Sequence, residues 1–289
     1  MTIHSMTGYA ALDRDLGALR LALELKSVNG RFFDLALRCA EELRFLEMSL
    51  REKLAAAIGR GKIDCRLQLQ PNATAGAQLA LNPTLVAQLA AVEGEIRRML
   101  PAAAPLSAAE VLRWPGVLAS EAISPERLQT ECVALLDAVL AEFLASRARE
   151  GARLADVLRE RLARMRTAIA KVDPLVPAAI ADYTERLATR LREAVATLDE
   201  ERIRQEIGVF AAKIDVAEEL ARLVAHLNEV ERVLARGGAV GKRLDFLMQE
   251  LNREANTLAA KSVSAAVTAI ALELKLLIEQ MREQVQNLE

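Results

Sequence analysis

The sequence predicts an α+β N-terminal domain followed by a mostly α-helical C-terminal domain with long helices and a helical hairpin. Residues 1–71 contain several segments in which apolar and polar side chains alternate with period two, as in half-buried strands. Residues 72–289 repeat apolar side chains at helical spacing instead. Hydrophobic residues make up 52% of the chain but aromatic residues only 3%, a balance that suits helices packed on helices. We therefore divide the chain into an α+β module at 1–71, a helical connecting region at 72–172 and a helical C-terminal domain at 173–289, which carries the candidate site.

The N-terminal module is predicted to have the element order β-β-β-α-β. Its expected elements are the strands Ile3–Leu12, Leu19–Val28, Phe33–Cys39 and Ile63–Leu69 and a helix over Glu41–Ile58. A polar turn at Asp13–Ala18 joins the first two strands as a hairpin, and Gly59 and Gly61 end the helix. Such an order implies an α+β unit that closes at about residue 71.

The connecting region is expected to be helical from Asn82 onward. Asn82-Pro83 is a typical helix start, with Asn as the cap and Pro at the first helical position. Pro101 and Pro105 break that helix because proline lacks the backbone N–H and clashes with the preceding turn. A long amphipathic helix is expected over Pro125–Val172.

The C-terminal domain is expected to end in a helical hairpin. Helical spacing runs over Ile180–Ala235 with a break near Leu198–Asp199, and the glycines of Gly237–Gly241 form a hinge. A helix over Lys242–Ala260 follows, and Ser264–Leu288 is expected to pack back on it. The second helix carries a heptad seam made of Val267, Ile270, Leu274, Leu277 and Met281.

Composition excludes several classes of protein. The net charge of −2 gives no global basic field for nucleic acid, and the scarcity of aromatic rings argues against a base-stacking groove. Cys39, Cys65 and Cys132 form no C-x-x-C pair, so a zinc knuckle or disulfide framework is not expected. The polar start at Thr2–Tyr9 is no signal peptide, and no run of about 18 apolar residues predicts a membrane span. A cytoplasmic protein is expected.

The first candidate site is a polar stripe on the helix that contains His226. Asp215, Glu219, Arg222 and His226 follow one another at steps of four, three and four, so a helix places them on one narrow face. Carboxylates beside a neutral imidazole suit Mg²⁺ or Mn²⁺, and the arginine fork suits a phosphate. The competing interpretation is a row of solvated ion pairs, which is the usual role of charges at this spacing.

A second stripe lies on the helix after the glycine hinge. In the segment Gly241–Ser262, one ridge contains Asp245, Gln249, Asn252 and Asn256, and another contains Glu250, Glu254, Thr257 and Lys261. Asparagine and aspartate disfavour helix interiors, so their presence suggests compensating contacts. If the hinge folds the two helices together, acids and amides from both stripes converge, which is what metal-assisted phosphodiester cleavage requires.

Long motifs along the chain resemble one protein family. They are SMTGY at Ser5–Tyr9, LKSVNGRFFDLALR at Leu25–Arg38, RGKID at Arg60–Asp64, EGARL at Glu150–Leu154, KIDVAEELARLVAHL at Lys213–Leu227, GKRLDFLMQELNREANTLAAKS at Gly241–Ser262 and ELKLLIEQMREQVQNLE at Glu273–Glu289. With these motifs the chain resembles the YicC/YloC family of bacterial stress-linked proteins from end to end. Ala259-Ala260 stands where the family pattern usually has Gly-Ser, which is of little consequence because alanine suits a helix.

The resemblance implies a divalent-metal-dependent endoribonuclease in a homo-oligomer, a hexamer that encloses RNA. It also implies an N-terminal α+β domain and a helical C-terminal domain. The residue chemistry adds candidate roles to this expectation. The expected metal ligands are Asp215, Glu219, Glu250, Glu254 and His226; the expected catalytic residues are His226, Glu219, Glu250 and Glu254; the expected RNA or phosphate contacts are Arg222, Arg253, Lys261, Asn252 and Asn256, with Arg31, Arg60 and Lys62 near the ends of the strands.

Two rival functions remain open from the sequence. The chain is an RNA-binding adaptor without chemistry of its own if the carboxylates only join helices. It is a structural assembly protein if the heptad helix is an interface and RNA does not bind. RNA binding that weakens with salt separates the adaptor from the assembly protein, because lysine and arginine contacts to phosphate impose that dependence.

Overall fold

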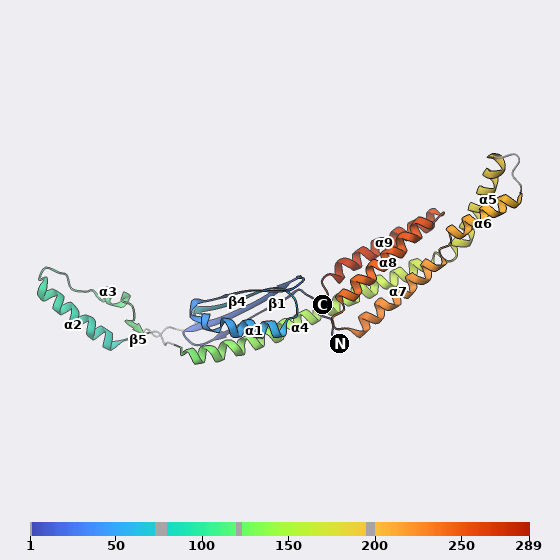
Figure 1. Ribbon diagram of the computed structural model, residues 1–289. Coiled ribbons are helices and arrows are strands. Elements are labelled where there is room, and N and C mark those ends of the chain that lie inside the picture. Colours follow the sequence, from blue (N-terminus) through green and yellow to red (C-terminus); the bar gives the residue numbers. More distant parts are fainter. Residues whose placement is uncertain (1, 73–79, 120–122, 195–199) are drawn as a thin grey trace.

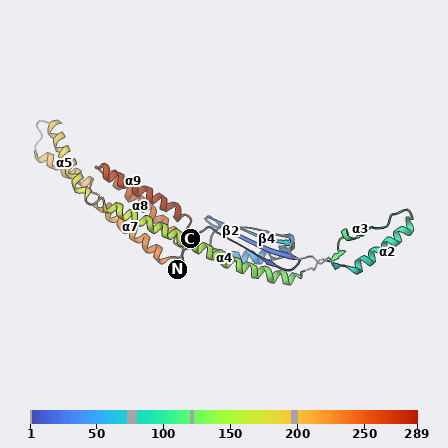
Figure 2. The ribbon, with the colours of Figure 1, turned by 180° about the vertical axis from the view of Figure 1, so that it is seen from behind.

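The computed structural model describes residues 2–72, 80–119, 123–194 and 200–289 of an elongated molecule (Figure 1). A four-stranded sheet lies at its centre, a small helical arm extends from one end, and a bundle of long helices forms the other end. Both chain termini lie where the sheet meets the bundle, as the view from behind also shows (Figure 2). The predicted fold class is confirmed.

The sheet contains β1 (Gly8–Asp15), β2 (Leu19–Val28), β3 (Phe33–Cys39) and β4 (Gly61–Pro71) in the order β1-β2-β4-β3. The pairs β1–β2 and β2–β4 are antiparallel, whereas β3 and β4 are parallel. Alternation buries Leu21, Leu23 and Leu25 on one face and turns their neighbours to the other. The buried face packs on the 3₁₀ helix η1 (Glu41–Leu46), on α1 (Glu47–Ala57) and on the first half of α4 (Pro125–Ala170).

The predicted first strand, Ile3–Leu12, is wrong in its bounds. β1 begins at Gly8 and continues to Asp15, because its pairing with β2 starts at Gly8 opposite Ser27. The segment before it crosses α4 instead, where the Ser5 N–H donates to the Arg147 carbonyl at 2.9 Å. The turn is correspondingly shorter than the predicted Asp13–Ala18, and Gly17 adopts φ +93° in it.

The arm comprises β5 (Ala80–Leu81), α2 (Pro83–Met99), α3 (Ala108–Arg113) and β6 (Leu118–Ala119). The expected cap is confirmed, because the Asn82 side chain accepts a hydrogen bond from the Leu85 N–H at 3.1 Å. No residue of α2 or α3 is buried. The arm therefore lacks a hydrophobic core of its own among its described residues. The predicted loop at Pro71–Gly76 lies largely outside the described residues.

α4 is a single helix of 46 residues, about 70 Å long at 1.5 Å per residue. Its first half, up to Phe143, belongs to the core under the sheet, and its second half, from Leu154, belongs to the core of the helical bundle. The predicted helix over Pro125–Val172 is thus confirmed. It connects the sheet and the bundle without an intervening loop (Figure 1).

The bundle continues with α5 (Leu175–Ala194), α6 (Glu200–Lys213), α7 (Ala217–Arg236), α8 (Gly241–Lys261) and α9 (Ala265–Val285). The expected continuous helix through Asp215 is wrong, because a non-helical turn at Ile214–Val216 separates α6 from α7. The break predicted near Leu198–Asp199 lies outside the described residues.

The C-terminal hairpin of α8 and α9 is confirmed. The apolar side chains on one side of α8 are buried: Leu244, Leu247, Met248, Leu251, Ala255 and Leu258. On α9 the seam residues Val267, Leu274, Leu277 and Met281 are buried too, while Ile270 packs at the margin of the core. No helix within the described ranges is long and apolar enough to span a membrane.

Candidate active site

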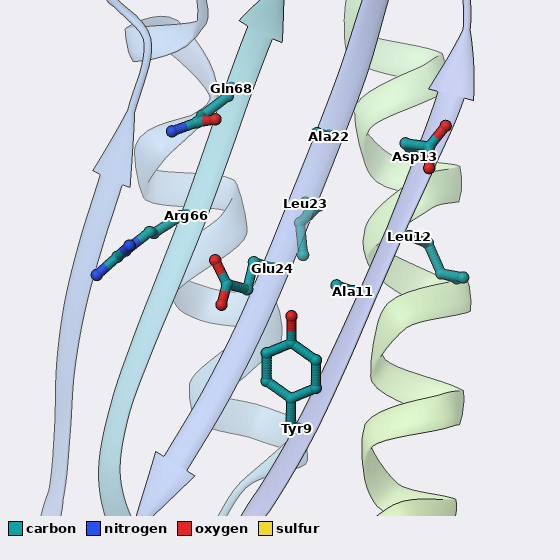
Figure 3. A pocket seen from close by; sticks show the side chains of 9 residues that line it. All are labelled: Tyr9, Ala11, Leu12, Asp13, Ala22, Leu23, Glu24, Arg66 and Gln68. Carbon is teal, nitrogen blue, oxygen red and sulfur yellow. The ribbon is translucent and has the colours of Figure 1, made fainter.

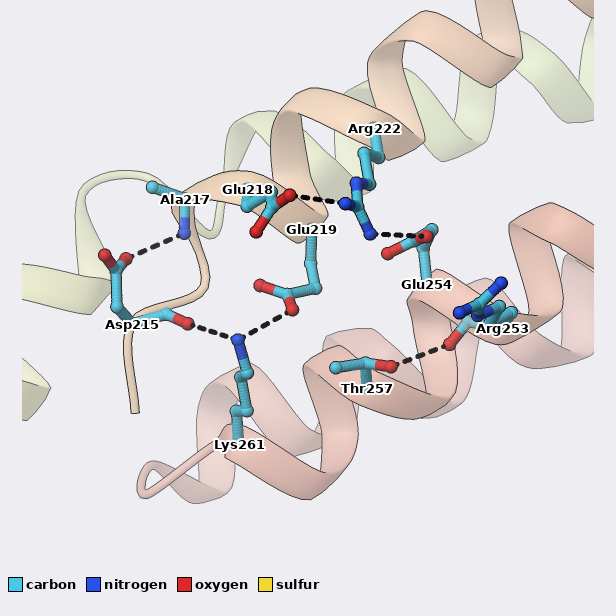
Figure 4. A network of polar contacts seen from close by, with 9 residues as sticks. All are labelled: Asp215, Ala217, Glu218, Glu219, Arg222, Arg253, Glu254, Thr257 and Lys261. Carbon is cyan, nitrogen blue, oxygen red and sulfur yellow. Dashed lines mark hydrogen bonds and ion pairs between the residues drawn. The ribbon is translucent and has the colours of Figure 1, made fainter. Parts of the chain in front are cut away.

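α7 and α8 form an antiparallel pair joined by a row of charges. Gly237 and Gly238 adopt φ +67° and +82°, which allows the sharp turn between the helices. Three ion pairs then cross from one helix to the other: Arg243–Glu229 at 3.3 Å, Arg222–Glu254 at 3.5 Å and Lys261–Glu219 at 2.7 Å. We call these six residues the charge ladder. The hinge therefore brings the two predicted stripes together (Figure 4).

Glu219 occupies the end of the charge ladder that is furthest from the hinge. Its side chain is only 6% exposed, and its Oε1 accepts the Lys261 ammonium. Lys261 also donates to the Asp215 carbonyl at 3.0 Å. The second carboxylate oxygen, Oε2, is buried without a hydrogen-bond donor among the described residues. Such an orphaned acceptor is rare in a folded protein and calls for a ligand or water.

Glu254 is the second buried carboxylate of the ladder, with a side chain 5% exposed. Arg222 reaches across from α7 to it and also pairs with Glu218 on its own helix (Figure 4). The Arg222 side chain is half exposed, so its guanidinium lies at the protein surface and the Glu254 carboxylate lies beneath it. Buried charges require such partners, because their desolvation costs several kcal/mol.

His226 and Glu250 continue the same face. His226 lies one turn after Arg222, and Glu250 lies one turn before Glu254. The antiparallel register set by the three cross-helix ion pairs makes His226 and Glu250 level with each other. Both residues are half-buried. Within residues 2–72, 80–119, 123–194 and 200–289, however, no three His, Cys, Asp or Glu side chains converge as a preformed metal cage.

Asp215 departs from its predicted place. It lies before α7, and its side chain accepts the Ala217 N–H at 2.9 Å, as an aspartate does in a turn. Its carboxylate is thereby turned away from Glu219, and only its carbonyl joins the cluster through Lys261 (Figure 4). The Asp215 side chain is therefore not part of the carboxylate group on the α7–α8 face.

The polar residues of the other α8 ridge have different surroundings. Arg253 and Asn256 are exposed and Asn252 is half-buried, and none of them joins the charge ladder. Asp245 lies closest to α9 instead, 3.8 Å from the Arg282 guanidinium, and accepts a hydrogen bond from Gln249. The expected compensation for the helix-breaking aspartate thus comes from α9.

The cations near the strand ends lie at the hinge end of α8, far from Glu219 and Lys261. The Arg60 guanidinium donates to the Leu288 carbonyl at 2.6 Å and approaches the start of α8 at Gly241. Lys261 ends that helix 20 residues later, roughly 30 Å away. Arg31 and Lys62 are exposed on the sheet module. Arg60 therefore lies at the opposite end of α8 from the Glu219–Lys261 pair.

A buried arginine that sequence analysis missed connects the two halves of the molecule. Arg147 is 2% exposed; its Nε donates to the Ser5 carbonyl at 2.5 Å, and its Nη2 pairs with Glu289. The Glu289 N–H in turn donates to the His4 carbonyl. Ser5 belongs to SMTGY and Glu289 ends the last motif, so the signal was two motifs from opposite ends of the chain. Their meeting point depends on tertiary structure.

The pKa values of one ladder carboxylate and of two buried thiols are shifted from their ordinary values. Hydrogen bonds from Arg232, opposed by desolvation and then reinforced by Arg243, lower the pKa of Glu229 to about 2. Burial, with a smaller contribution from neighbouring carboxylates, raises the pKa of Cys65 to about 12 and that of Cys132 to about 11. These thiols stay protonated at neutral pH, so neither is a nucleophile.

The charge ladder combines the groups that phosphodiester chemistry uses. Two buried carboxylates lie beneath two cations, and an imidazole and a third carboxylate continue the face. A phosphate that approaches Arg222 and Lys261 would compete with Glu254 and Glu219 for them, which would free carboxylate oxygens. Mg²⁺ fits such a donor set, because it commonly takes only one or two carboxylates and completes its shell with water and substrate phosphate.

Comparison with known proteins gives full-length matches. Residues 3–156 match the family described as endoribonuclease YicC-like, N-terminal region, and residues 169–289 match endoribonuclease YicC-like, C-terminal. The chain is 42% identical over 298 residues to a probable endoribonuclease YicC of Haemophilus influenzae, covering 99% of this chain and 100% of that protein. It is 26% identical over 290 residues to a probable endoribonuclease YicC of Clostridioides difficile, covering 99% of each. The similarity expected from the sequence motifs is confirmed.

Proposed function

The chain belongs to the family of YicC-like endoribonucleases, and from this premise we propose that it cleaves phosphodiester bonds within RNA on the α7–α8 face. The observation that carries this assignment is the pair of buried carboxylates, Glu219 and Glu254, each matched to a cation at the surface. Helices that needed only to pack would place leucine there, because a buried ion pair is weak evidence for stability. The pair is therefore better explained by chemistry on an anionic substrate.

We propose that a divalent cation, Mg²⁺ or Mn²⁺, is part of the site. Glu219 and Glu254 would hold it, with Glu250 and His226 beside them; the buried Glu219 Oε2 has no hydrogen-bond donor among the residues that the structure describes. Asp215 is left out of this set because its side chain caps Ala217. When bound, the ion would offset phosphate charge and lower the pKa of a water ligand.

The proposed role of Arg222 and Lys261 is to exchange partners. In the free protein they neutralise Glu254 and Glu219; with RNA bound, they would donate to phosphate oxygens instead. His226 would accept or donate the proton at the reacting oxygen, because histidine is the side chain that most often serves as a general acid or base. Arg253, Asn252 and Asn256, outside the ladder on the same helix, would contact the RNA backbone.

Two cleavage chemistries are compatible with these roles. His226 could deprotonate a water molecule or the 2′-hydroxyl of the RNA itself. The end group on the product distinguishes the two: attack by water that expels the 3′-oxygen leaves a 3′-hydroxyl, whereas attack by the 2′-hydroxyl expels the 5′-oxygen and leaves a cyclic phosphate. Mass spectrometry of a cleaved oligonucleotide therefore identifies the nucleophile.

We propose that the active form is a homo-oligomer, a hexamer that encloses RNA in the cytoplasm. Two features support association of several chains. The arm exposes an apolar groove of about 400 Å³ with no buried residue in α2 or α3 beneath it, and Arg60 lies at the opposite end of α8 from the Glu219–Lys261 pair. The three cysteines are free, which agrees with a reducing compartment.

Glutamine substitutions test the proposed site. Glu219→Gln and Glu254→Gln, and the double variant Glu250→Gln/Glu254→Gln, should lower RNA cleavage by about 100-fold or more, while RNA binding and oligomer mass stay unchanged. Glu283→Gln, an exposed carboxylate on α9, is the matched control and should cleave normally. Full activity in the three ladder variants would remove the site from α7–α8.

The rival function is an adaptor that binds RNA without cutting it. It predicts that the purified wild-type protein leaves labelled RNA intact with Mg²⁺ and with Mn²⁺, although binding persists and weakens with salt. Cleavage that follows the protein through purification and disappears in Glu254→Gln would exclude the adaptor.

A further inference from the structure

One face of the central sheet is covered by no described helix. α1 and α4 both lie behind the sheet, and the opposite face carries the side chains that point away from the buried core (Figure 3). We call it the open sheet face; its residues include Tyr9, Ala11, Asp13, Ala22, Glu24, Lys26, Ala36, Arg38, Asp64, Arg66, Gln68 and Gln70. This face is far richer in polar groups than a protein-docking centre, which is depleted of charge.

The first feature of the open sheet face is a hollow of about 220 Å³ beside Tyr9. Its floor consists of two short side chains, those of Ala11 and Ala22. Ala11 lies opposite Glu24 in the sheet, and Ala22 lies opposite Asp13. The Tyr9 ring is 54% exposed and lies at the edge of the hollow, with the Glu24 carboxylate near it (Figure 3). Its volume is several times the roughly 30 Å³ of one water molecule.

Glu24 is the unused acid of this hollow. Asp13 is paired with Arg20 at 2.7 Å. Within the described part of the chain, by contrast, neither the Glu24 carboxylate nor the Tyr9 hydroxyl has a hydrogen-bond or ion-pair partner. The hollow thus offers an aromatic face next to an acceptor-only group, which suits a planar ligand that carries an amino group.

A second hollow of about 440 Å³ adjoins the first at Arg66 and Gln68. Its polar side chains are those of Arg38, Arg66, Gln68 and Gln70. Both guanidiniums share one carboxylate, since Asp64 lies 3.8 Å from Arg38 and 3.4 Å from Arg66. Glu24 lies opposite Arg66 in the sheet but points toward Tyr9, so the second hollow itself presents two guanidiniums and two amides. These donors suit a phosphate.

We propose that the open sheet face binds single-stranded RNA, with one base stacked on Tyr9, its amino group donating to Glu24, and a neighbouring phosphate held by Arg38 and Arg66. Tyr9 on β1 and Arg66 on β4 are two strand spacings and two residues apart, roughly 12 Å, so base and phosphate occupy adjacent hollows. A paired base cannot stack on the ring, which selects single strands. Cytosine, adenine and guanine carry the amino group that Glu24 requires, whereas uracil does not.

This inference rests on the proposed RNA-cleaving function and adds a substrate-binding surface to it. Aromatic residues are too scarce for a groove in which several successive bases stack. Tyr9 therefore provides a stacking place for one base only. The hollow is on the sheet, whereas the charge ladder is on the helical bundle. Loss of the Tyr9 contact should therefore weaken substrate affinity without changing the chemical step.

Binding of fluorescent ten-nucleotide RNAs to the full-length protein, measured in EDTA, tests the open sheet face. Tyr9→Ala should raise the Kd for oligo(C) and oligo(A) about tenfold, and Tyr9→Phe should restore it to within about twofold. Ala11→Leu, which fills the hollow, should act like Tyr9→Ala. Glu24→Gln should reduce the preference over oligo(U). Arg66→Ala should weaken binding of all sequences and lower the salt dependence by about one phosphate contact.

Phe45→Ala is the matched control, because Phe45 is also 54% exposed but lies in η1 on the covered side of the sheet. It should bind and cleave like wild type, and Tyr9→Ala should raise KM with kcat unchanged. If the wild type cuts RNA and Tyr9→Ala binds RNA as the wild type does, RNA binding by the open sheet face is refuted, while the proposed cleavage function stands. If the wild type neither binds nor cuts RNA, the proposed function fails and this inference fails with it.

Discussion

The single side chains that matter most in this molecule are charged groups placed out of water. Glu219, Glu254 and Arg147 are each about 5% exposed or less, and each has a partner of opposite charge. Removal of one partner from such a pair leaves an uncompensated buried charge, which is more costly than removal of both. This asymmetry separates structural from chemical roles by experiment.

Lys261 provides the first test at the residue scale. Lys261→Met should destabilise the protein by about 2–3 kcal/mol in urea unfolding, because Glu219 then lies buried without its cation. Adding Glu219→Gln should recover much of that loss. Lys242→Met, an exposed lysine at the other end of α8, should change little. Equal stability of Lys261→Met and wild type would show that the pair does not hold α7 against α8.

The cysteines provide the second test at the residue scale. The pKa values of Cys65 and Cys132 are raised to about 12 and 11 by burial, so at pH 8 both stay as unreactive thiols. Only half-buried Cys39, whose pKa burial raises as well, should react with a disulfide reagent before unfolding. All three should react in denaturant. Fast labelling of more than one thiol in the native protein would contradict this burial.

The sequence identified most of the candidate site at this scale but not its pairings. Periodicity placed Glu219, Arg222 and Glu254 on polar stripes, and the glycine hinge predicted that the stripes meet. It could not show that Lys261 chooses Glu219, which depends on the packing of α7 on α8. It also misplaced Asp215, because the turn at Ile214–Val216 contains no glycine or proline to mark it.

At the scale of elements, close approaches between segments decide where glycine is required. A Cβ on Gly151 of α4 would lie 2.2 Å from the Ile3 carbonyl oxygen, and one on Gly241 would lie 2.4 Å from that of Leu288. Both neighbours are backbone atoms, which cannot turn aside. These glycines allow the chain ends to pack directly against helices.

Gly151→Ala should therefore destabilise the protein by about 1–3 kcal/mol through overpacking. Gly94→Ala in α2 is the matched control, since its Cβ would meet nothing within 4 Å, and it should stabilise its helix by about 0.5–1 kcal/mol. Thermal unfolding and amide exchange of α2 measure the two effects. A neutral Gly151→Ala would mean that the Ser5 segment is not held against α4.

The helices were predictable from spacing and caps, whereas strand bounds were not. Asn82, the prolines and the glycine hinge mark helix ends by local chemistry, so α2, α4 and α8 agree with expectation. β1 is displaced from its predicted range because Ile3 and Met6 are buried against other elements, and burial there mimics strand alternation. Periodicity reports which side chains are buried and not what buries them.

At the scale of the whole molecule, the arm is the part that a single chain leaves incomplete. Val92, Ile96 and Met99 of α2 are 53%, 48% and 79% exposed. Neither α2 nor α3 has a buried residue, so the arm gains little from packing within the chain, and we expect another copy of the chain to cover it. Glu93 and Arg97 line the same groove, and two copies related by a two-fold axis can pair them with each other.

Val92→Glu/Ile96→Glu should therefore reduce the oligomer mass measured by light scattering, because charge is placed in the buried centre of the interface. Val209→Glu on α6 is a control of matched exposure, at 56%, and should leave the mass unchanged. An oligomer that persists in the double variant would place the interface elsewhere.

Because α4 is one continuous helix, it fixes the angle about its axis between the face that packs on the sheet and the face that packs in the bundle. The two matched family regions meet between residues 156 and 169, inside this helix and not in a linker. One residue inserted between Phe143 and Leu154 would rotate one core against the other by about 100°. Seven inserted residues would nearly restore the angle, to about 20°, but would separate the cores by roughly 10 Å. The number of residues between Phe143 and Leu154 therefore sets both the angle and the distance between the two cores. A homologue that keeps this arrangement must keep the same number of residues in this part of α4.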